Sequence, residues 1–123
     1  ALVSLIEDFE LAKLKIPTLV EDAEHRGIAI YRSEIVDGSV PTLEQAFAIV
    51  QFAKAMSRSG HNVVFHCKGG LGRAGTLCAC TLVAMGELPM KAIQQTRNAR
   101  KGAVENSIQE KFVVQFAQFL NKK

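Results

Sequence analysis

The amino-acid sequence predicts an α/β fold, with a central, mainly parallel sheet flanked by helices. Short apolar runs typical of strands alternate along the 123 residues with longer segments in which apolar side chains recur at helical spacing. Strands that alternate with helices in this way are typical of a parallel sheet. We find no internal repeat, linker or low-complexity segment that interrupts the pattern.

The first two predicted strands cover residues 2–5 and 28–31. Between them, an acidic start followed by spaced apolar residues predicts a short helix over residues 7–14. Pro17 suits the first turn of a second helix, which runs to about residue 25 and is stopped by Gly27.

A polar loop over residues 32–41 then leads into a long helix. Thr42 is expected to cap this helix at its N-terminus, and apolar side chains recur at helical spacing until the chain approaches Gly60. Residues 62–65 form a short apolar run, which is the pattern of a strand buried on both faces.

The remainder of the chain is predicted to be helical apart from its loops. A glycine-rich stretch over residues 68–72 is followed by helices over residues 73–85, 89–99 and 106–120. The last helix carries four large apolar residues on one stripe, namely Ile108, Phe112, Phe116 and Phe119.

Composition and charge restrict the class of protein. The chain is 48% apolar and 22% charged, as globular proteins are, and its length fits a single domain over residues 1–123. It starts at Ala1 rather than Met, directly on an apolar run. The expected domain therefore includes the case that natural residues before Ala1 are missing. A net charge of +3 suits an anionic substrate but is too small to indicate a nucleic acid. No apolar run reaches the ~20 residues that cross a bilayer, so no membrane partner is expected.

The chain has three cysteines, Cys67, Cys78 and Cys80, and none of them belongs to a CxxC pair. This odd number favours free thiols in a reducing compartment, and a cytoplasmic location is therefore expected.

The segment His66-Cys67-Lys68-Gly69-Gly70-Leu71-Gly72-Arg73 carries most of the chemical information. It lies between a predicted strand and a predicted helix, where a glycine-rich turn can point successive backbone N–H groups at an anion. The Arg73 guanidinium can hold two phosphate oxygens, and with the helix dipole it favours a thiolate at Cys67. These features predict that Cys67 attacks phosphorus while Arg73 and the loop bind phosphate. The phosphate-binding loop residues are Lys68, Gly69, Gly70, Leu71 and Gly72.

This segment resembles HCxxxxxR, the signature loop of the protein tyrosine and dual-specificity phosphatases. The resemblance covers nearly the whole chain: residues 35–41 look like the loop that carries the general acid in that superfamily. Residues 100–105 with Gln109 look like the segment that closes the site in the kinase-associated (cyclin-dependent kinase inhibitor type) dual-specificity phosphatases.

The resemblance implies a protein tyrosine phosphatase-like fold and hydrolysis of phosphate monoesters through a cysteinyl-phosphate, without cofactor or metal. The expected substrates are proteins phosphorylated on tyrosine, on serine or threonine, or on both kinds of residue, or other phosphate monoesters. Oxyanions such as phosphate, sulfate or vanadate are expected to bind in the loop.

Asp37 is the candidate general acid, because the leaving oxygen needs a proton from a segment that faces the loop. Glu34 is the fallback acid. By the resemblance, His66 supports the loop and tunes the cysteine without acting as a base. Gln109 resembles the glutamine that orients the hydrolytic water in related enzymes.

Ala74 departs from the resembling family, which usually has Ser or Thr directly after the arginine. There the hydroxyl stabilises the thiolate that departs when the phosphoenzyme breaks down, and alanine cannot donate that hydrogen bond. Two outcomes are expected as alternatives: hydrolysis of the intermediate is slow, or Thr76 partly substitutes.

Other interpretations of the same residues remain open. Residues 70–75 formally match the dinucleotide fingerprint GxGxxG, although the chain continues into a helix where that fingerprint expects a second strand. Cys67 alone would be a small buried apolar residue, and Asp37 followed by Gly38 would be a turn.

Two alternative functions also remain. A catalytically impaired phospho-binding module would keep the loop and lose turnover, and Ala74 is the feature that points to it. Sulfur or arsenate chemistry can use the same type of cysteine loop. An acid on the 35–41 loop favours cleavage of a phosphate ester instead, because a poor leaving group needs a proton.

Overall fold

The computed structural model describes residues 1–69 and 71–123, and its elements follow the predicted alternation. In chain order they are β1 (Leu2–Ser4), α1 (Asp8–Lys13), α2 (Leu19–His25), β2 (Ile30–Arg32), α3 (Leu43–Arg58), β3 (Val64–His66), α4 (Arg73–Ala84), α5 (Pro89–Ala99) and α6 (Ser107–Asn121). The helix expected from Pro17 starts two residues later, because Pro17 and Thr18 form a turn that precedes it.

Within the described residues, β1 is the central strand of a three-stranded sheet with the order β2-β1-β3. It pairs with both neighbours in parallel, and Val3 lies opposite Tyr31 of β2 and Phe65 of β3. Val3 is fully buried. The prediction of an α/β fold around a parallel sheet is confirmed.

The expectation that the third strand is buried on both faces is wrong. Val64 of β3 is 57% exposed, and its two neighbours in the strand are only half-buried. In the part of the chain that the structure describes, β3 pairs with β1 alone and is therefore an edge strand. The apolar run correctly indicated a strand, but it could not indicate how many neighbours that strand has.

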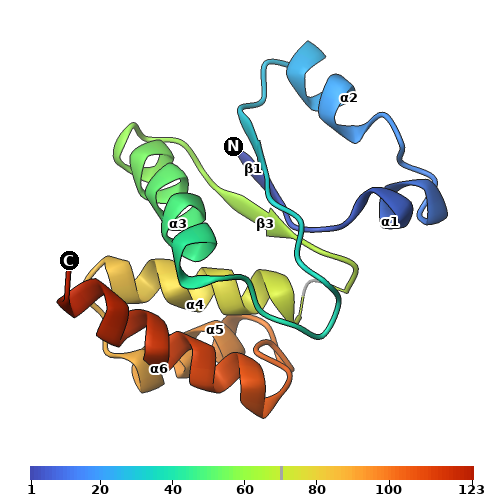
Figure 1. Ribbon diagram of the computed structural model, residues 1–123. Coiled ribbons are helices and arrows are strands. Elements are labelled where there is room, and N and C mark those ends of the chain that lie inside the picture. Colours follow the sequence, from blue (N-terminus) through green and yellow to red (C-terminus); the bar gives the residue numbers. More distant parts are fainter. Residues whose placement is uncertain (70) are drawn as a thin grey trace.

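Figure 1 shows α3, α4, α5 and α6 gathered together against the strands, with α1 and α2 lying apart from that group. α4 is the most buried helix, since Leu77, Ala79 and Cys80 are fully inaccessible to solvent. None of the helices among residues 1–69 and 71–123 has the length and apolar character needed to cross a membrane.

The apolar stripe predicted for the last helix lies on α6, and its phenylalanines pack into the core. Phe112 and Phe116 are buried, with ring centroids 6.5 Å apart, and Phe119 packs against the core. Ile108, the fourth residue of the stripe, is 60% exposed and does not pack in the core as the phenylalanines do. It lies in the first turn of α6, at the rim of the packed region, where helical spacing alone does not ensure a packing partner.

The start of α3 positions the loop that precedes it. The Thr42 hydroxyl accepts a hydrogen bond from the Gln45 N–H (3.0 Å), and the Gln45 side chain accepts one from the Thr42 N–H, which confirms Thr42 as the predicted cap. The amide of Gln45 also donates to Ser33 Oγ (2.7 Å) and to the Glu34 carbonyl (2.9 Å). Hydrogen bonds from α3 therefore hold Ser33 and Glu34, the residues that connect β2 to the loop carrying Asp37.

The segment between α5 and α6 lies directly against the first turn of α4. A Cβ added at Gly75 would come within 2.9 Å of the Val104 nitrogen and 3.0 Å of Ala103 Cβ. Val104 has a φ of 55°, which is unusual for a β-branched residue, and its N–H donates to the Leu71 carbonyl (2.9 Å). Gly75 is therefore needed for close approach, and this approach holds residues 103–104 against the loop before α4.

Substituting Gly75→Ala should lower the free energy of unfolding by roughly 1–2 kcal/mol, although alanine is the better helix former. Urea denaturation would measure the change. Gly69→Ala is the matched control, because a Cβ there meets nothing within 4 Å. Equal stability of the two variants would show that the contact is not tight in solution.

Candidate active site

The predicted phosphate-binding segment connects the end of β3 to the start of α4. His66 is the last residue of β3, and Arg73 is the first residue of α4. Lys68 and Gly69 are exposed, Leu71 is half-buried and Gly72 is buried. Gly70, which the sequence also assigned to phosphate binding, lies outside the described residues.

Cys67 lies where the first turn of α4 begins. It is only 8% exposed and is a free thiol. Its Sγ accepts a hydrogen bond from the Ala74 N–H at 3.4 Å, across seven positions of the chain. This N–H belongs to the unpaired first turn of α4, so the helix presents its positive end to the sulfur.

Arg73 is buried and held by a carboxylate that the sequence analysis did not identify. Its Nη1 and Nη2 donate to the two oxygens of Glu10, each at 2.8 Å, and Nη1 also donates to the Ile35 carbonyl at 2.8 Å. The hydrogen bonds from Arg73 lower the pKa of Glu10 to about 2, and the same bonds raise the pKa of Arg73. Both groups are therefore charged at neutral pH.

One donor of Arg73 finds no partner in the part of the chain that the structure describes. Its Nε is buried, and no acceptor among the described residues lies within hydrogen-bonding distance. An unsatisfied buried donor is costly, and an oxyanion is the kind of group that would satisfy it.

The structure brings Asp37 to the phosphate-binding segment. Its Oδ1 lies 3.6 Å from Arg73 Nη2, while its side chain is 60% exposed. Gly38 and Ser39 are fixed from the opposite side: Asn106 Nδ2 donates to the Gly38 carbonyl (3.1 Å), and Gln109 Nε2 lies 3.5 Å from the Ser39 carbonyl. Asp37 thus stands on a loop attached to α6 and can still reach solvent or substrate.

Glu34, the fallback acid, is engaged elsewhere. Its carboxylate forms an ion pair with Arg32 (3.0 Å) and accepts a hydrogen bond from the Asp8 N–H (3.1 Å). Asp37 is therefore the acid that the geometry favours.

His66 lies under the segment and contacts β1. Its Nε2 is 2.7 Å from Ser4 Oγ, and Ser4 is fully buried. Burial is the main cause that lowers the pKa of His66, so the ring is neutral near pH 7. This arrangement agrees with a supporting role, and Ser4 is a further residue that the sequence analysis missed.

Gln109, the residue expected to orient the hydrolytic water, is fully buried and lies next to Gly72. Its Oε1 accepts a hydrogen bond from the Glu105 N–H (2.9 Å), and a Cβ added at Gly72 would lie 2.9 Å from its Nε2. The amide therefore reaches both Gly72 and the loop that carries Asp37.

The structure does not support Thr76 as a substitute for the missing hydroxyl. The Thr76 hydroxyl donates to the Gly72 carbonyl at 2.7 Å, so its only proton is committed within α4. Among the described residues, the donor that reaches Cys67 Sγ is the backbone N–H of Ala74.

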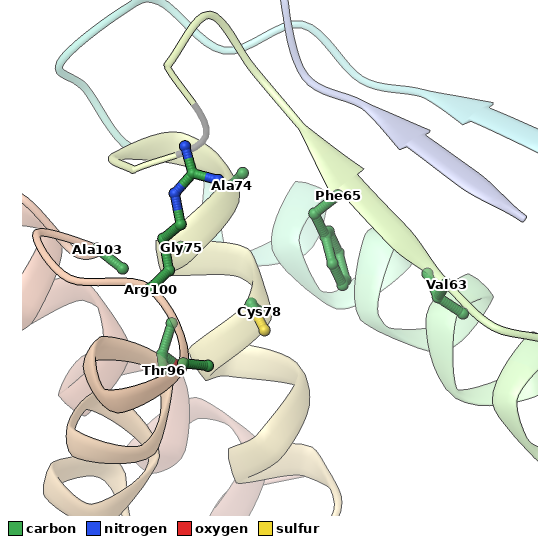
Figure 2. Close-up of a pocket in the computed structure, with 9 residues that line it drawn as sticks. Val63, Phe65, Ala74, Gly75, Cys78, Thr96, Arg100 and Ala103 are labelled. Atoms are coloured by element: carbon green, nitrogen blue, oxygen red, sulfur yellow. The ribbon is translucent and has the colours of Figure 1, made fainter.

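Arginine side chains from α5 and its C-cap secure the neighbouring segments. Arg100 Nη2 donates to the Gly69 carbonyl (2.9 Å), and Arg97 donates to the carbonyls of Ala103 and Val104. Figure 2 shows Arg100 at the rim of a cavity of about 260 Å³ between β3, α4 and α5. Cys78 lines this cavity, and burial raises the pKa of its thiol.

No group of three or more His, Cys, Asp or Glu side chains is placed to hold a metal ion within residues 1–69 and 71–123.

Comparison with known proteins agrees with this geometry. A family model described as "Polymorphic toxin system, DSP-PTPase phosphatase" matches residues 1–87, which include Asp37, Cys67 and Arg73. Cyclin-dependent kinase inhibitor 3 of Rattus norvegicus is 28% identical over 110 residues, covering 87% of this chain and 52% of that protein. The chain thus spans about half the length of the curated relatives it matches first.

Two solved structures show the same fold. Tk-PTP in its active form has a TM-score of 0.87 at 32% identity, covering 95% of this chain and 77% of that chain. A kinase associated phosphatase with serine in place of its catalytic site cysteine has a TM-score of 0.91 at 25% identity, covering 99% and 70%.

These matches confirm the predicted protein tyrosine phosphatase-like fold and the resemblance to kinase-associated phosphatases. The family model covers residues 1–87 of the 123, more than half of the chain. The chain belongs to the DSP-PTPase phosphatase family described for polymorphic toxin systems, within the superfamily of tyrosine and dual-specificity phosphatases.

Proposed function

We propose that this protein hydrolyses phosphate monoesters of phosphorylated proteins through a cysteinyl-phosphate on Cys67. The observation that carries the proposal is the placement of Cys67 Sγ, 3.4 Å from the Ala74 N–H at the start of α4, on the segment that ends in Arg73. A sulfur at this position can attack a phosphoryl group that the helix N-terminus and Arg73 hold.

In the first step Cys67 Sγ attacks phosphorus and the bond between phosphorus and the ester oxygen breaks. Asp37 gives its proton to the departing oxygen. The backbone N–H groups of Lys68, Gly69, Leu71 and Gly72 are the candidates for binding the phosphoryl oxygens. Gly70 remains a candidate on the sequence alone.

In the second step a water attacks phosphorus, gives its proton to Asp37, and the sulfur–phosphorus bond breaks. The Ala74 N–H stabilises the departing thiolate. Gln109 is the residue proposed to orient the water, since its buried amide lies between Gly72 and the Asp37 loop.

Arg73 would bind the phosphoryl group through its Nε, the donor for which residues 1–69 and 71–123 offer no acceptor. Its other two nitrogens are held by Glu10 and by the Ile35 carbonyl, so the guanidinium is positioned before substrate arrives. The same donor supports the expectation that phosphate, sulfate or vanadate binds here.

The cytoplasm remains the proposed location. All three cysteines are free thiols, and a nucleophilic thiol stays active in a reducing compartment.

The second candidate function is a phospho-binding module without turnover. It is favoured by Ala74, together with the commitment of the Thr76 hydroxyl to Gly72.

Rapid-mixing kinetics with p-nitrophenyl phosphate should show a stoichiometric burst of p-nitrophenol for the wild type and no release for Cys67→Ser. Asp37→Ala should lower kcat/KM, which reports formation of the phosphoenzyme, about a hundredfold for phenyl phosphate, whose leaving group needs the proton, and much less for p-nitrophenyl phosphate. Cys78→Ser is the matched control and should keep activity. Tight oxyanion binding by a wild type that releases no product would favour the phospho-binding module.

Ala74→Ser should speed breakdown of the phosphoenzyme about tenfold, because the new hydroxyl adds a second donor for the departing sulfur. The burst phase would keep its rate while the steady-state rate rises. Ala79→Ser, which is also buried in α4, controls for a general effect of a hydroxyl in this helix. An unchanged steady-state rate would show that the Ala74 N–H alone suffices.

A further inference from the structure

A second cavity opens beside the catalytic residues, apart from the cavity of Figure 2. It has a volume of about 310 Å³ and is lined by Phe9, Glu10, Lys13, Leu14, Asp37 and Lys68. The cavity therefore lies between α1 and two residues of the candidate active site, the proposed acid Asp37 and Lys68 of the phosphate-binding segment.

The Glu10–Arg73 ion pair fixes which side of α1 faces this cavity. Glu10 is buried on Arg73, and Lys13 and Leu14 follow three and four positions later, on the same side of the helix. Phe9 precedes Glu10 and also lines the cavity. Glu10, which positions the Arg73 guanidinium, thus also fixes the orientation of the α1 residues that line the cavity.

The apolar part of this wall is open to solvent. Phe9 is 61% exposed and Leu14 is 39% exposed, although both lie beside the phosphate site. An exposed aromatic ring next to a reaction site offers a packing surface for the organic part of a substrate.

The charged part of the wall consists of two lysines, Lys13 and Lys68, and two carboxylates, Glu10 and Asp37. Lys13 and Lys68 are exposed, and neither forms an ion pair with any residue that the structure describes. The carboxylates of Glu10 and Asp37 both lie against Arg73, at 2.8 and 3.6 Å. A second anionic group on the substrate, beyond the phosphate, would therefore meet two ammonium groups.

From these features we infer that the cavity selects phosphotyrosine in an acidic sequence, an inference that rests on the proposed phosphatase function. The phenyl ring packs on Phe9 and Leu14 while the phosphate reaches Cys67, and a neighbouring Glu or Asp of the substrate binds Lys13 and Lys68. Phosphoserine and phosphothreonine have no ring to place against Phe9. Phe9 and Lys13 are thus specificity-determining residues.

The test compares three peptides of one sequence: phosphotyrosine flanked by Glu, phosphotyrosine flanked by Gln, and phosphothreonine flanked by Glu. Each is measured with the wild type, Phe9→Ala, Phe9→Tyr and Lys13→Gln by kcat/KM. Dissociation constants are measured with the same substitutions in a Cys67→Ser background. Met90→Ala and Lys91→Gln are the matched controls, because both residues are exposed on α5.

The inference predicts that Phe9→Ala lowers kcat/KM for both phosphotyrosine peptides about tenfold and changes the phosphothreonine value less than twofold. Phe9→Tyr keeps the wild-type values. Lys13→Gln lowers the value for the Glu-flanked peptides about threefold and leaves the Gln-flanked peptide unchanged. The control variants behave as the wild type.

Equal losses on all three peptides, or no losses, would overturn the inference while leaving the phosphatase function intact. So would a soluble phosphoinositide that is hydrolysed faster than every peptide, since the cavity would then serve a lipid headgroup. Absence of phosphate release from every substrate would count against the proposed function instead. In that case the dissociation constants in the Cys67→Ser background still decide whether Phe9 and Lys13 contact the ligand.

Discussion

The rest of the site depends on the buried ion pair between Glu10 and Arg73. Two charges taken from water are costly to bury, and here a two-point contact and the Ile35 carbonyl offset that cost. Because the pKa of Glu10 is lowered to about 2, the pair contributes its full stability above the ordinary carboxyl pKa of 4.5. That contribution is lost as the pH falls toward 2. The pair joins α1, the acid loop and α4 into one arrangement.

The position of the candidate catalytic segment, between a strand and a helix, was predictable because its signal is local. Cys67, the glycines and Arg73 lie within a few residues of one another, between a strand and a helix that their own patterns indicate. Glu10 carries no such signal: it lies 63 positions from Arg73 and resembles its acidic neighbours in the same short helix. Ser4 is likewise 62 positions from His66. Only the parallel pairing of β1 with β3 brings these partners together.

The fold was predictable where periodicity decides it and less so where neighbours decide it. The spacing of apolar residues located α3, α5 and α6 to within two residues, and the Thr42 cap was identified from its residue type. The exposure of Val64 and Ile108 could not be predicted, because apolar character does not reveal whether another element lies opposite. The suggested role of Thr76 near Cys67 is not supported for a related reason. Its hydroxyl donates to the nearer carbonyl of Gly72 instead.

The affinity of the Glu10→Gln variant for orthovanadate tests most directly whether this ion pair prepares the phosphate site. Removing a negative charge beside an anion site should by charge alone tighten anion binding. The account predicts the opposite, a loss of about tenfold, because Arg73 is no longer held in position. Glu24→Gln, at an exposed position of α2, is the control and should bind as the wild type. Equal or tighter binding by a folded Glu10→Gln variant would contradict the account.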